Sequence, residues 1–399
     1  MLPAGQVSYL EYIEEQLQDW QNKSIRRRLR FDATLLDFSS NDYLCLNRDG
    51  SHTQMLQSLA AEFSYDTVGS TGSRLIRGHW PSFEEAEMQF CEWQDLPAAL
   101  LFQSGYSANV GALSAISGPG DVAFCDRLCH ASLLDGIRLS GAQRHYFHHN
   151  DLDHLESLLK KKGTRKRRWV LSEGVFSMDG DCPDVRGILD LCHKYDATLY
   201  LDEAHALGYL GSRRSPGGGL VAALREQASI SSQELHDRII LSFPMGKAPG
   251  IMGGFVAGGK ALREFLINRA RSFVFSTAQP PILAAMIARI VRNFQEGAYD
   301  DRMLHLRSNA EFLRSKMESL GRQSTSQSAI VPFLIGDARD ALDMSKHLET
   351  NGFDVRAIRP PTVAEGSSRL RITVHSCHST ESIARLLATV LDADLHSRN

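Results

Sequence analysis

The sequence predicts an α/β protein in which a mainly parallel sheet forms a large domain and a smaller α+β domain follows it. Short apolar runs alternate with helix-length segments through the middle of the chain, as expected for parallel strands whose faces are covered by helices. Polar or glycine-rich motifs follow several of these runs directly, at the position where such sheets bind ligands. The runs span residues 122–124, 169–171, 198–201 and 239–241.

Length and composition are those of a large globular protein. The 399 residues, 43% of them hydrophobic, are enough for two or three domains, and the formal net charge of −3 gives no general attraction to nucleic acid or to a membrane. The apolar runs are too short to span a bilayer. The N-terminus lacks the basic and apolar regions of a secretory signal, so we expect a cytoplasmic protein.

A basic run at residues 160–168 has no interleaved aromatic residues and is interpreted as a solvated loop.

The cysteines predict reduced thiols. There are seven of them, scattered along the chain, which favours mostly buried free thiols over a disulfide framework. Cys125, Cys129 and His130 resemble part of a zinc site, but no second cluster completes four ligands. We therefore expect no metal centre.

The N-terminal segment is predicted to form an amphipathic helix over about the first thirty residues, because its apolar residues recur at helical spacing. A basic run at residues 26–28 suits the negative end of such a helix. Alternatively, one of these arginines reaches an anionic substrate. The apolar positions are Leu10, Ile13, Leu17 and Trp20.

We expect three parts of the chain. Residues 1–50 would form an N-terminal helix and linker, residues 51–285 a large ligand-binding domain, and residues 286–399 a small α+β domain. The predicted elements of the small domain are strands at 329–335, 354–358 and 369–374 and helices near 338–349 and 380–391.

Two segments are candidates for binding a phosphate group. Residues 69–78 are rich in glycine and serine, which permits close backbone approach to a ligand, although a structural turn would have the same composition. In residues 97–110 an apolar run leads into Ser104, Gly105 and Tyr106, where a helix can begin. The N–H groups of a helix N-terminus point outward and carry the positive end of the dipole, which suits this turn to a phosphate.

Lys247 and Asp202 fit covalent chemistry. Lys247 follows the run at 239–241 among glycines, where burial would lower the pKa of its amine and make it nucleophilic. Asp202 ends the run at 198–201 and needs a partner such as the protonated ring nitrogen of pyridoxal phosphate, although helix capping would also explain it. His205 and His130 also follow strands, and the ring of His130 could stack on a flat cofactor or serve as a core or capping residue.

Motifs along nearly the whole chain resemble those of the α-oxoamine synthases, a family of fold-type I pyridoxal-phosphate enzymes. In order they are DFSSNDYL, GSTGSRL, SGYSAN, DRLCHASLLDG, EGVFSMDGD, LDEAHALG, the GK pair that ends at Lys247, FSTAQPP and IRPPTV…RLRITV. The resemblance implies a fold-type I transferase with a seven-stranded sheet in its large domain. It also implies pyridoxal 5′-phosphate as the cofactor and a homodimer whose active site lies at the subunit interface.

The resemblance implies roles for individual residues. Lys247 would bind the cofactor covalently. Asp202 would pair with the ring nitrogen, His205 with the ring oxygen, and His130 would stack on the ring. The remaining cofactor contacts would come from Gly105, Tyr106, Ser177 and, from the second subunit, Thr277. The substrate-binding residues would be Arg26, Asn41, His130, Thr362 and Arg371, with the guanidinium of Arg371 holding the carboxylate of the amino acid.

Members of this family condense an amino acid with an acyl thioester and release carbon dioxide. The IRPPTV run and the residues around His130 point, within the family, to L-alanine and a pimeloyl thioester of coenzyme A or an acyl carrier protein, the substrates of a step in biotin biosynthesis. Glycine or serine with a shorter or longer acyl chain is the alternative. A second alternative is that this chain is a related protein without catalytic activity.

Two positions depart from the family pattern. Pro244 stands where the family usually has Thr or Ser, three residues before the lysine, and it offers the phosphate neither a hydroxyl nor an N–H. Ser242 is a possible substitute. Phe83 stands where the family usually has His after the glycine loop, and His79 lies about one helical turn away.

Overall fold

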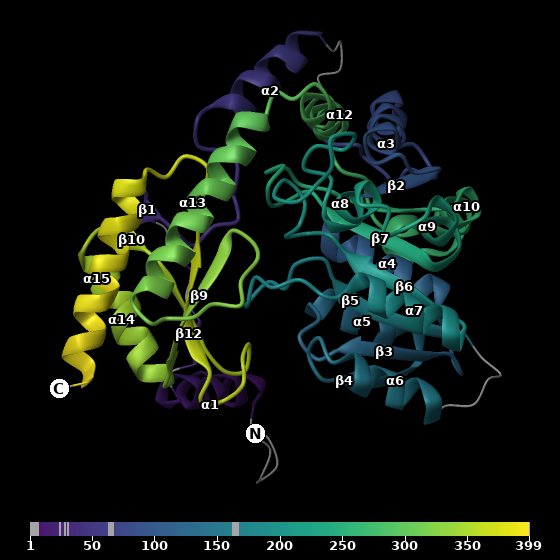
Figure 1. The fold of residues 1–399 in the computed structure, drawn as a ribbon. Helices are drawn as coiled ribbons and strands as arrows, with labels where there is room; N and C mark the ends of the chain where they lie inside the picture. The colour runs from purple at the N-terminus through teal and green to yellow at the C-terminus, as the bar shows by residue number, and fades with distance from the viewer. Residues whose placement is uncertain are drawn as a thin grey trace.

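The computed structural model describes residues 8–23, 25–27, 29, 32–62, 68–161 and 167–398. A large domain and a small domain face each other across the middle of the molecule (Figure 1). Residues 162–166 of the predicted basic loop and Arg28 of the N-terminal basic run lie outside the described residues.

The large domain is built on a seven-stranded sheet with the order β2-β8-β7-β6-β5-β3-β4, which confirms the predicted α/β class. Strands β4, β3, β5, β6 and β7 are parallel, whereas β8 is antiparallel to both of its neighbours. The strands are β2 (Ala98–Phe102), β3 (Val122–Asp126), β4 (Gln143–Phe147), β5 (Arg168–Glu173), β6 (Ala197–Asp202), β7 (Ile239–Pro244) and β8 (Gly254–Gly258).

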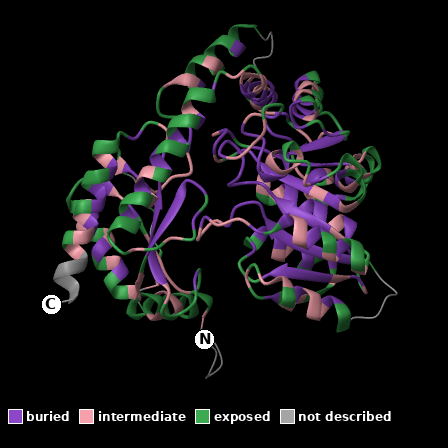
Figure 2. Ribbon diagram, in the orientation of Figure 1, coloured by how far each residue is buried: buried purple, intermediate pink, exposed green. Residues whose placement is uncertain are grey.

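Helices cover both faces of this sheet (Figure 2), and β2, β5 and β8 are therefore buried throughout. One hydrophobic cluster joins the sheet to α4 (Gly105–Ile116), α5 (Ala131–Ser140), α10 (Lys260–Arg269) and α11 (Arg271–Val274). A second, larger cluster covers the other face. Its helices are α2 (Ser51–Glu62), α3 (Pro81–Gln94), α6 (Leu152–Lys161), α7 (Val185–Tyr195), α8 (Leu220–Glu226), α9 (Ser232–Arg238), α12 (Pro281–Gln295) and the first half of α13 (Asp300–Ser319).

The small domain is α+β, as predicted. Its antiparallel sheet has the order β11-β12-β9, and a separate two-stranded pair joins β1 in parallel to β10. Phe38, directly after β1, lies fully buried in the core of this domain, so a segment that precedes the large domain in sequence packs with the C-terminal part. The limits at residues 50 and 285 stay a proposal. The elements are β1 (Leu36–Asp37), β9 (Ile330–Gly336), α14 (Ala338–Thr350), β10 (Phe353–Asp354), β11 (Arg356–Ile358), β12 (Ser368–Thr373) and α15 (Thr380–Arg398).

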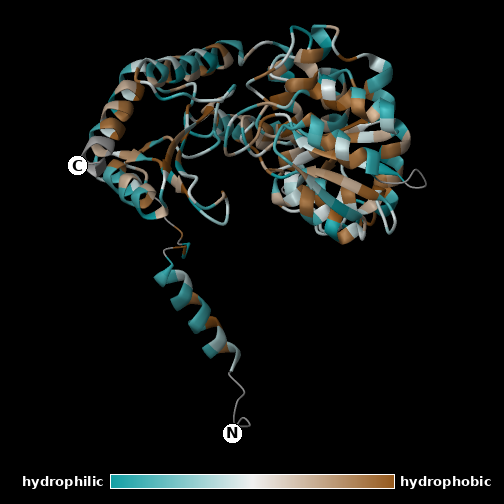
Figure 3. Ribbon diagram, turned by 60° about the horizontal axis from the view of Figure 1, so that its bottom comes forward, coloured by the Kyte–Doolittle hydropathy of each residue, from teal (hydrophilic) through white to brown (hydrophobic). Residues whose placement is uncertain are grey.

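Helix α1 (Tyr9–Asn22) is shorter than predicted, because Lys23 caps it and the basic residues follow in a loop. Ser8 and Glu11 form a capping box at its start. None of its residues is buried within this chain, and the helix projects away from the two domains (Figure 3). Within the described part of the chain, every helix is too short or too polar to cross a bilayer.

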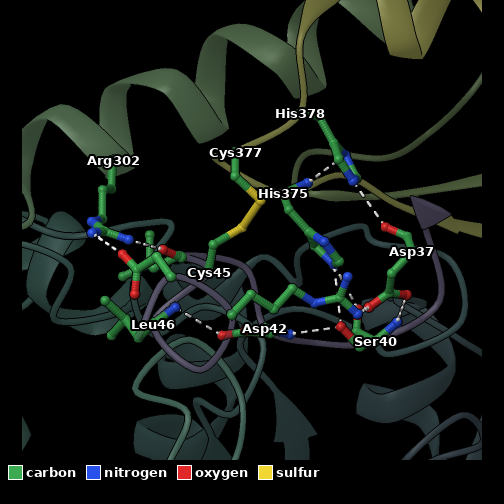
Figure 4. Close-up of a disulfide and its surroundings, with 12 residues drawn as sticks. Asp37, Ser40, Asp42, Cys45, Leu46, Arg302, His375, Cys377 and His378 are labelled. Carbon is green, nitrogen blue, oxygen red and sulfur yellow. Dashed lines mark hydrogen bonds and ion pairs between the residues drawn. A yellow bond between two sulfur atoms is a disulfide. The ribbon is translucent and has the colours of Figure 1, made fainter. Parts of the chain in front are cut away.

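The prediction that all cysteines are free thiols is wrong for one pair. A disulfide joins Cys45, in the segment after β1, to Cys377, after β12, with a Cα–Cα distance of 6.2 Å (Figure 4). The two residues are 332 positions apart, so no local spacing could indicate the pair. Cys45 is buried, whereas Cys377 is exposed and open to reductants. The bond ties the segment at 41–47 to the small domain.

Loss of this disulfide is expected to lower the free energy of unfolding by about 2–4 kcal/mol, because the bond restrains a long loop of the unfolded chain. Thermal denaturation of wild type and Cys377→Ser, with and without dithiothreitol, measures the effect. Cys182→Ser, which alters a free thiol, is the matched control and should respond to dithiothreitol as wild type does. A melting temperature of wild type that dithiothreitol leaves unchanged would contradict the prediction.

Candidate active site

The predicted site residues of the large domain gather at the carboxyl edge of its sheet. Asp202 is the last residue of β6, Lys247 comes three residues after β7, and His130 and Ser104 follow β3 and β2. The carboxyl ends of parallel strands meet at one edge, so residues far apart in sequence come together there. The small domain adds Arg371 from the opposite side, through β12.

Asp202 is a buried carboxylate that receives hydrogen bonds from neutral donors. Its side chain is only 3% exposed, its Oδ2 accepts from Asn109 Nδ2 at 2.6 Å, and its Oδ1 accepts from the Ala204 N–H at 2.9 Å. Among the described residues it forms no ion pair. A buried carboxylate is costly without a positive partner, so this geometry suits a cationic group of a ligand.

The surroundings of Lys247 differ from those of an exposed surface lysine. It is half-buried, in a tight loop where the Gly250 N–H donates to the Lys247 carbonyl at 2.8 Å and Gly250 has a φ of +65°. Burial lowers the pKa of the amine, while the carboxylates of Asp202 and Glu173 oppose the shift. The lysine is therefore closer to its neutral, nucleophilic form than an exposed lysine would be.

His205 is a buried neutral imidazole. Burial lowers its pKa well below the ordinary value, and the positive charges of Lys247 and Arg371 lower it further. Its Nδ1 lies 2.6 Å from the hydroxyl of Tyr43, which comes from the segment after β1. Tyr43, from the N-terminal side of the chain, thus holds the side chain of His205, which lies just after β6.

His130 is the N-cap of α5, so the capping role considered from sequence is present. The Ser132 N–H donates to its Nδ1 at 3.3 Å, and the Ser132 hydroxyl lies 2.8 Å from the same atom. Its own backbone N–H donates to Glu173 Oε1 at 2.5 Å. Burial lowers the pKa of His130, with Asp202 opposing the shift. These contacts hold a neutral ring beside Asp202 and Lys247.

The predicted helix start at Ser104–Tyr106 is confirmed. Ser104 caps α4 through a reciprocal pair of hydrogen bonds with Ser107, and the N–H groups of Gly105 and Tyr106 have no acceptor within the helix. A side chain at Gly105 would place its Cβ 2.4 Å from the Cβ of Pro244, so only glycine fits. The turn therefore presents outward-pointing N–H groups at the positive end of α4, which suits an anion.

Pro244 occupies the place where a hydroxyl was expected, and its ring packs against the N-terminus of α4. Ser242 does not replace that hydroxyl at the surface of the site, because it is fully buried and pairs in register with Asp202. Phe83, the other departure, belongs to the core, where the guanidinium of Arg74 lies 4.7 Å from its ring centre.

Pro244→Thr is expected to tighten binding of pyridoxal phosphate by about 2- to 12-fold, the effect of one added hydrogen bond to a ligand phosphate at the start of α4. Fluorescence titration of the apoprotein with the cofactor measures the dissociation constant. Pro244→Val has the shape of threonine without its hydroxyl and is the matched control. Equal affinities of the two variants would show that the hydroxyl does not reach the phosphate.

Arg371 brings two predicted site residues together. This arginine is 6% exposed, and its Nη2 donates to Asn41 Oδ1 at 2.9 Å, its Nε to the Ser177 carbonyl at 2.6 Å and its Nη1 to Thr373 Oγ1 at 2.8 Å. Asn41 comes from the segment after β1 and Ser177 from the loop after β5. Arg371, Asn41 and Ser177 therefore form one hydrogen-bonded group where the two domains meet.

Three predicted residues lie outside this group. Arg26 is exposed in the loop after α1, and its neighbour Arg27 donates through Nη2 to Thr362 Oγ1 at 3.4 Å. Among the described residues, neither Arg26 nor Thr362 forms a hydrogen bond with Arg371. Thr277 is exposed, and its carbonyl accepts from Gln103 Nε2 at 3.0 Å. Its expected role belongs to a second subunit, so a single chain leaves that prediction open.

Sequence reasoning missed four residues that support the site. Asn109 donates to Ser132 Oγ at 2.9 Å and accepts from the Tyr200 hydroxyl at 3.0 Å, which orients its amide toward Asp202. Glu173 is 2% exposed, and burial followed by the charge of Asp202 raises its pKa to about 8. Each of these residues lies in a quoted motif or beside one, which was the available signal. The four residues are Tyr43, Asn109, Ser132 and Glu173.

Comparisons with known proteins show the family to which this chain belongs. Residues 33–390 match the family model for aminotransferase class I and II. The chain is 38% identical over 381 residues to 8-amino-7-oxononanoate synthase of Chromobacterium violaceum, with 92% of this chain and 95% of the relative covered.

Solved structures support the same fold. 8-Amino-7-oxononanoate synthase of Francisella tularensis aligns with a TM-score of 0.76 and 26% identity, covering 92% of this chain and 100% of the other. Serine palmitoyltransferase of Sphingomonas wittichii aligns with a TM-score of 0.85 over 98% of each chain. Its 24% identity supports the fold alone.

The residues present fit pyridoxal phosphate. The start of α4 presents free N–H groups for a phosphate, Asp202 is a buried carboxylate without a described cationic partner, and Lys247 is an amine with a lowered pKa. The chain therefore belongs to the class I and II aminotransferase family and is a pyridoxal-phosphate-dependent acyltransferase of the α-oxoamine synthase type, similar to the 8-amino-7-oxononanoate synthases.

Proposed function

We propose that this enzyme condenses L-alanine with a pimeloyl thioester in biotin biosynthesis. The products are 8-amino-7-oxononanoate, carbon dioxide and the free thiol of the carrier, so the carboxylate of alanine leaves and its Cα bonds to the acyl carbon. The observation that supports these substrates is the 38% identity, over nearly the whole chain, to a protein named for this product.

We propose that Lys247 binds the cofactor covalently, and that its amine, once released, removes the Cα proton of the amino acid. When bound, pyridoxal phosphate supplies an electron sink for the carbanion that proton removal creates. Lys247 suits the proton transfer because burial lowers the pKa of its amine toward neutral pH.

We propose that the other residues around the ring hold it in place. Asp202 keeps the ring nitrogen protonated, His205 donates to the ring oxygen, and His130 covers one face of the ring. The contacts that hold these three side chains favour the assignment, since each is buried or half-buried and bonded to a neighbour. The phosphate would be held by the N–H groups of Gly105 and Tyr106, with Ser177 and Thr277 as further contacts.

We propose that Arg371 binds the carboxylate of alanine. It has the planar, two-point donor geometry that carboxylates favour, and Asn41 orients one of its nitrogens. Thr362 and Arg26 would also face the substrates, and the contact between Arg27 and Thr362 brings the loop after α1 close to Thr362. We also propose a cytoplasmic homodimer, in which Thr277 reaches the site of the second subunit.

A substrate panel tests this function. Alanine, glycine and serine are each incubated with acetyl, pimeloyl and palmitoyl thioesters, and released carbon dioxide and thiol are measured. The expected result is a kcat/KM for alanine with the pimeloyl thioester that exceeds every other pair, and comparison of the coenzyme A and acyl-carrier-protein thioesters identifies the carrier. A preference for serine with palmitoyl thioester would instead favour a serine palmitoyltransferase, whose fold this chain shares. No turnover with any pair would favour a protein without catalytic activity.

A further inference from the structure

Tyr43 connects the predicted cofactor residues with the predicted substrate residues. It is fully buried, in the segment between β1 and α2, and its carbonyl accepts from the Ser376 N–H at 2.8 Å, so the small domain fixes its backbone. Its ring lies 6.2 Å from the ring of His205, measured between centres. The segment is therefore rigidly placed between β6 of the large domain and β12 of the small one.

The hydroxyl of Tyr43 has two possible acceptors and one proton. His205 Nδ1 lies at 2.6 Å, and Asn41 Oδ1 lies at 3.3 Å and already accepts from Arg371. The short distance from the Tyr43 hydroxyl to His205 Nδ1 indicates that the hydroxyl donates its hydrogen bond there, with Nδ1 as the acceptor.

An imidazole whose Nδ1 accepts a hydrogen bond carries its own proton on Nε2 when it is neutral. His205 is neutral here, because burial and nearby cations lower its pKa. Without a donor at Nδ1, the ring could take either tautomer, and one of them would point a lone pair at a ring oxygen of the cofactor. The tautomer therefore decides whether His205 attracts or repels that oxygen.

We propose that Tyr43 is a positioning residue that holds His205 as the Nε2–H tautomer, so that His205 donates to the ring oxygen of the cofactor. The inference rests on the cofactor role proposed above for His205. The same hydroxyl lies 3.3 Å from Asn41 Oδ1, which accepts from Arg371, so His205 is held next to the group proposed to bind the substrate carboxylate.

The test is a double-mutant cycle on cofactor affinity. Tyr43→Phe, His205→Leu and the double variant are titrated as apoproteins with pyridoxal phosphate, and the visible absorbance of each is followed against pH. We expect Tyr43→Phe to raise the dissociation constant by about 2- to 12-fold, the effect of one lost hydrogen bond, and to have no further effect in the His205→Leu background. Tyr299→Phe, which removes a buried hydroxyl bonded to Asn293 away from the site, is the matched control and should bind as wild type does.

An equal effect of Tyr43→Phe in both backgrounds would overturn the proposal, because Tyr43 would then act independently of His205. A wild-type affinity of Tyr43→Phe would overturn it as well. If Tyr43→Phe does not fold, the ¹⁵N shifts of histidine-labelled wild type decide, with His205→Leu identifying the resonance, and a proton on Nδ1 would contradict the proposal. None of these measurements needs a substrate, so a failure of the alanine and pimeloyl assignment would be recognised separately.

Discussion

Lys247→Ala is expected to abolish the visible absorbance of the lysine-bound cofactor and to lower turnover by at least about 10²–10⁴-fold, the range for loss of a general base alone. The reason is the position of the amine, half-buried after β7 among Asp202, Glu173 and Arg371, which act on its pKa. Absorbance of the desalted protein and release of thiol from pimeloyl thioester measure the two effects. Borohydride treatment of wild type should attach the cofactor to the peptide that contains Lys247.

Lys260→Ala is the control for this variant, because Lys260 is an exposed lysine at the start of α10 in the same domain. It should keep both the absorbance and the activity of wild type. A Lys247→Ala protein that retains the visible absorbance after desalting and still turns over would overturn the assignment of Lys247 as the covalent anchor.

Strands β3, β5, β6 and β7 could be predicted from sequence because they are almost wholly buried and therefore mainly apolar. The two strands that were not predicted lack this signal. Strand β4 at the edge has the sequence QRHYF with mostly exposed side chains, and β8, with the sequence GFVAG, follows the glycines after Lys247. Glycine is typical of loops, so the sequence of β8 did not indicate a strand.

The site was predictable to the extent that it depends on strand ends. Asp202, Lys247 and His130 meet because β6, β7 and β3 end at one edge of the sheet, which follows from the alternating pattern. The contacts between domains were not predictable in that way. Tyr43 reaches His205 across 162 positions and Arg371 reaches Asn41 across 330, because the segment after β1 packs with the small domain.

Asp202→Asn is expected to lower turnover by about 10- to 10³-fold, because it removes the negative charge that would hold the ring nitrogen protonated. A neighbouring opposite charge shifts a pKa by about 1–3 units, which changes the protonated fraction by those factors when the ring nitrogen would otherwise be neutral. The amide keeps the size of the carboxylate and can still accept from Asn109. The fold should therefore be kept, which thermal denaturation checks, while steady-state kinetics measure the loss.

Asp126→Asn separates this charge effect from the cost of altering a buried strand-end aspartate. Asp126 ends β3 on the same edge, is fully buried, and accepts from the Leu128 and Asn150 N–H groups, but it pairs with His149 rather than with Asn109. Each substitution replaces a carboxylate oxygen by an NH2 group, which cannot accept the hydrogen bond of a backbone N–H. Both variants should therefore have a lower melting temperature than wild type. Only Asp202→Asn should shift the pH dependence of the cofactor absorbance. Equal shifts in the two variants would mean that the absorbance responds to the total charge at the carboxyl edge of the sheet. Asp202 would then have no specific role at the ring nitrogen.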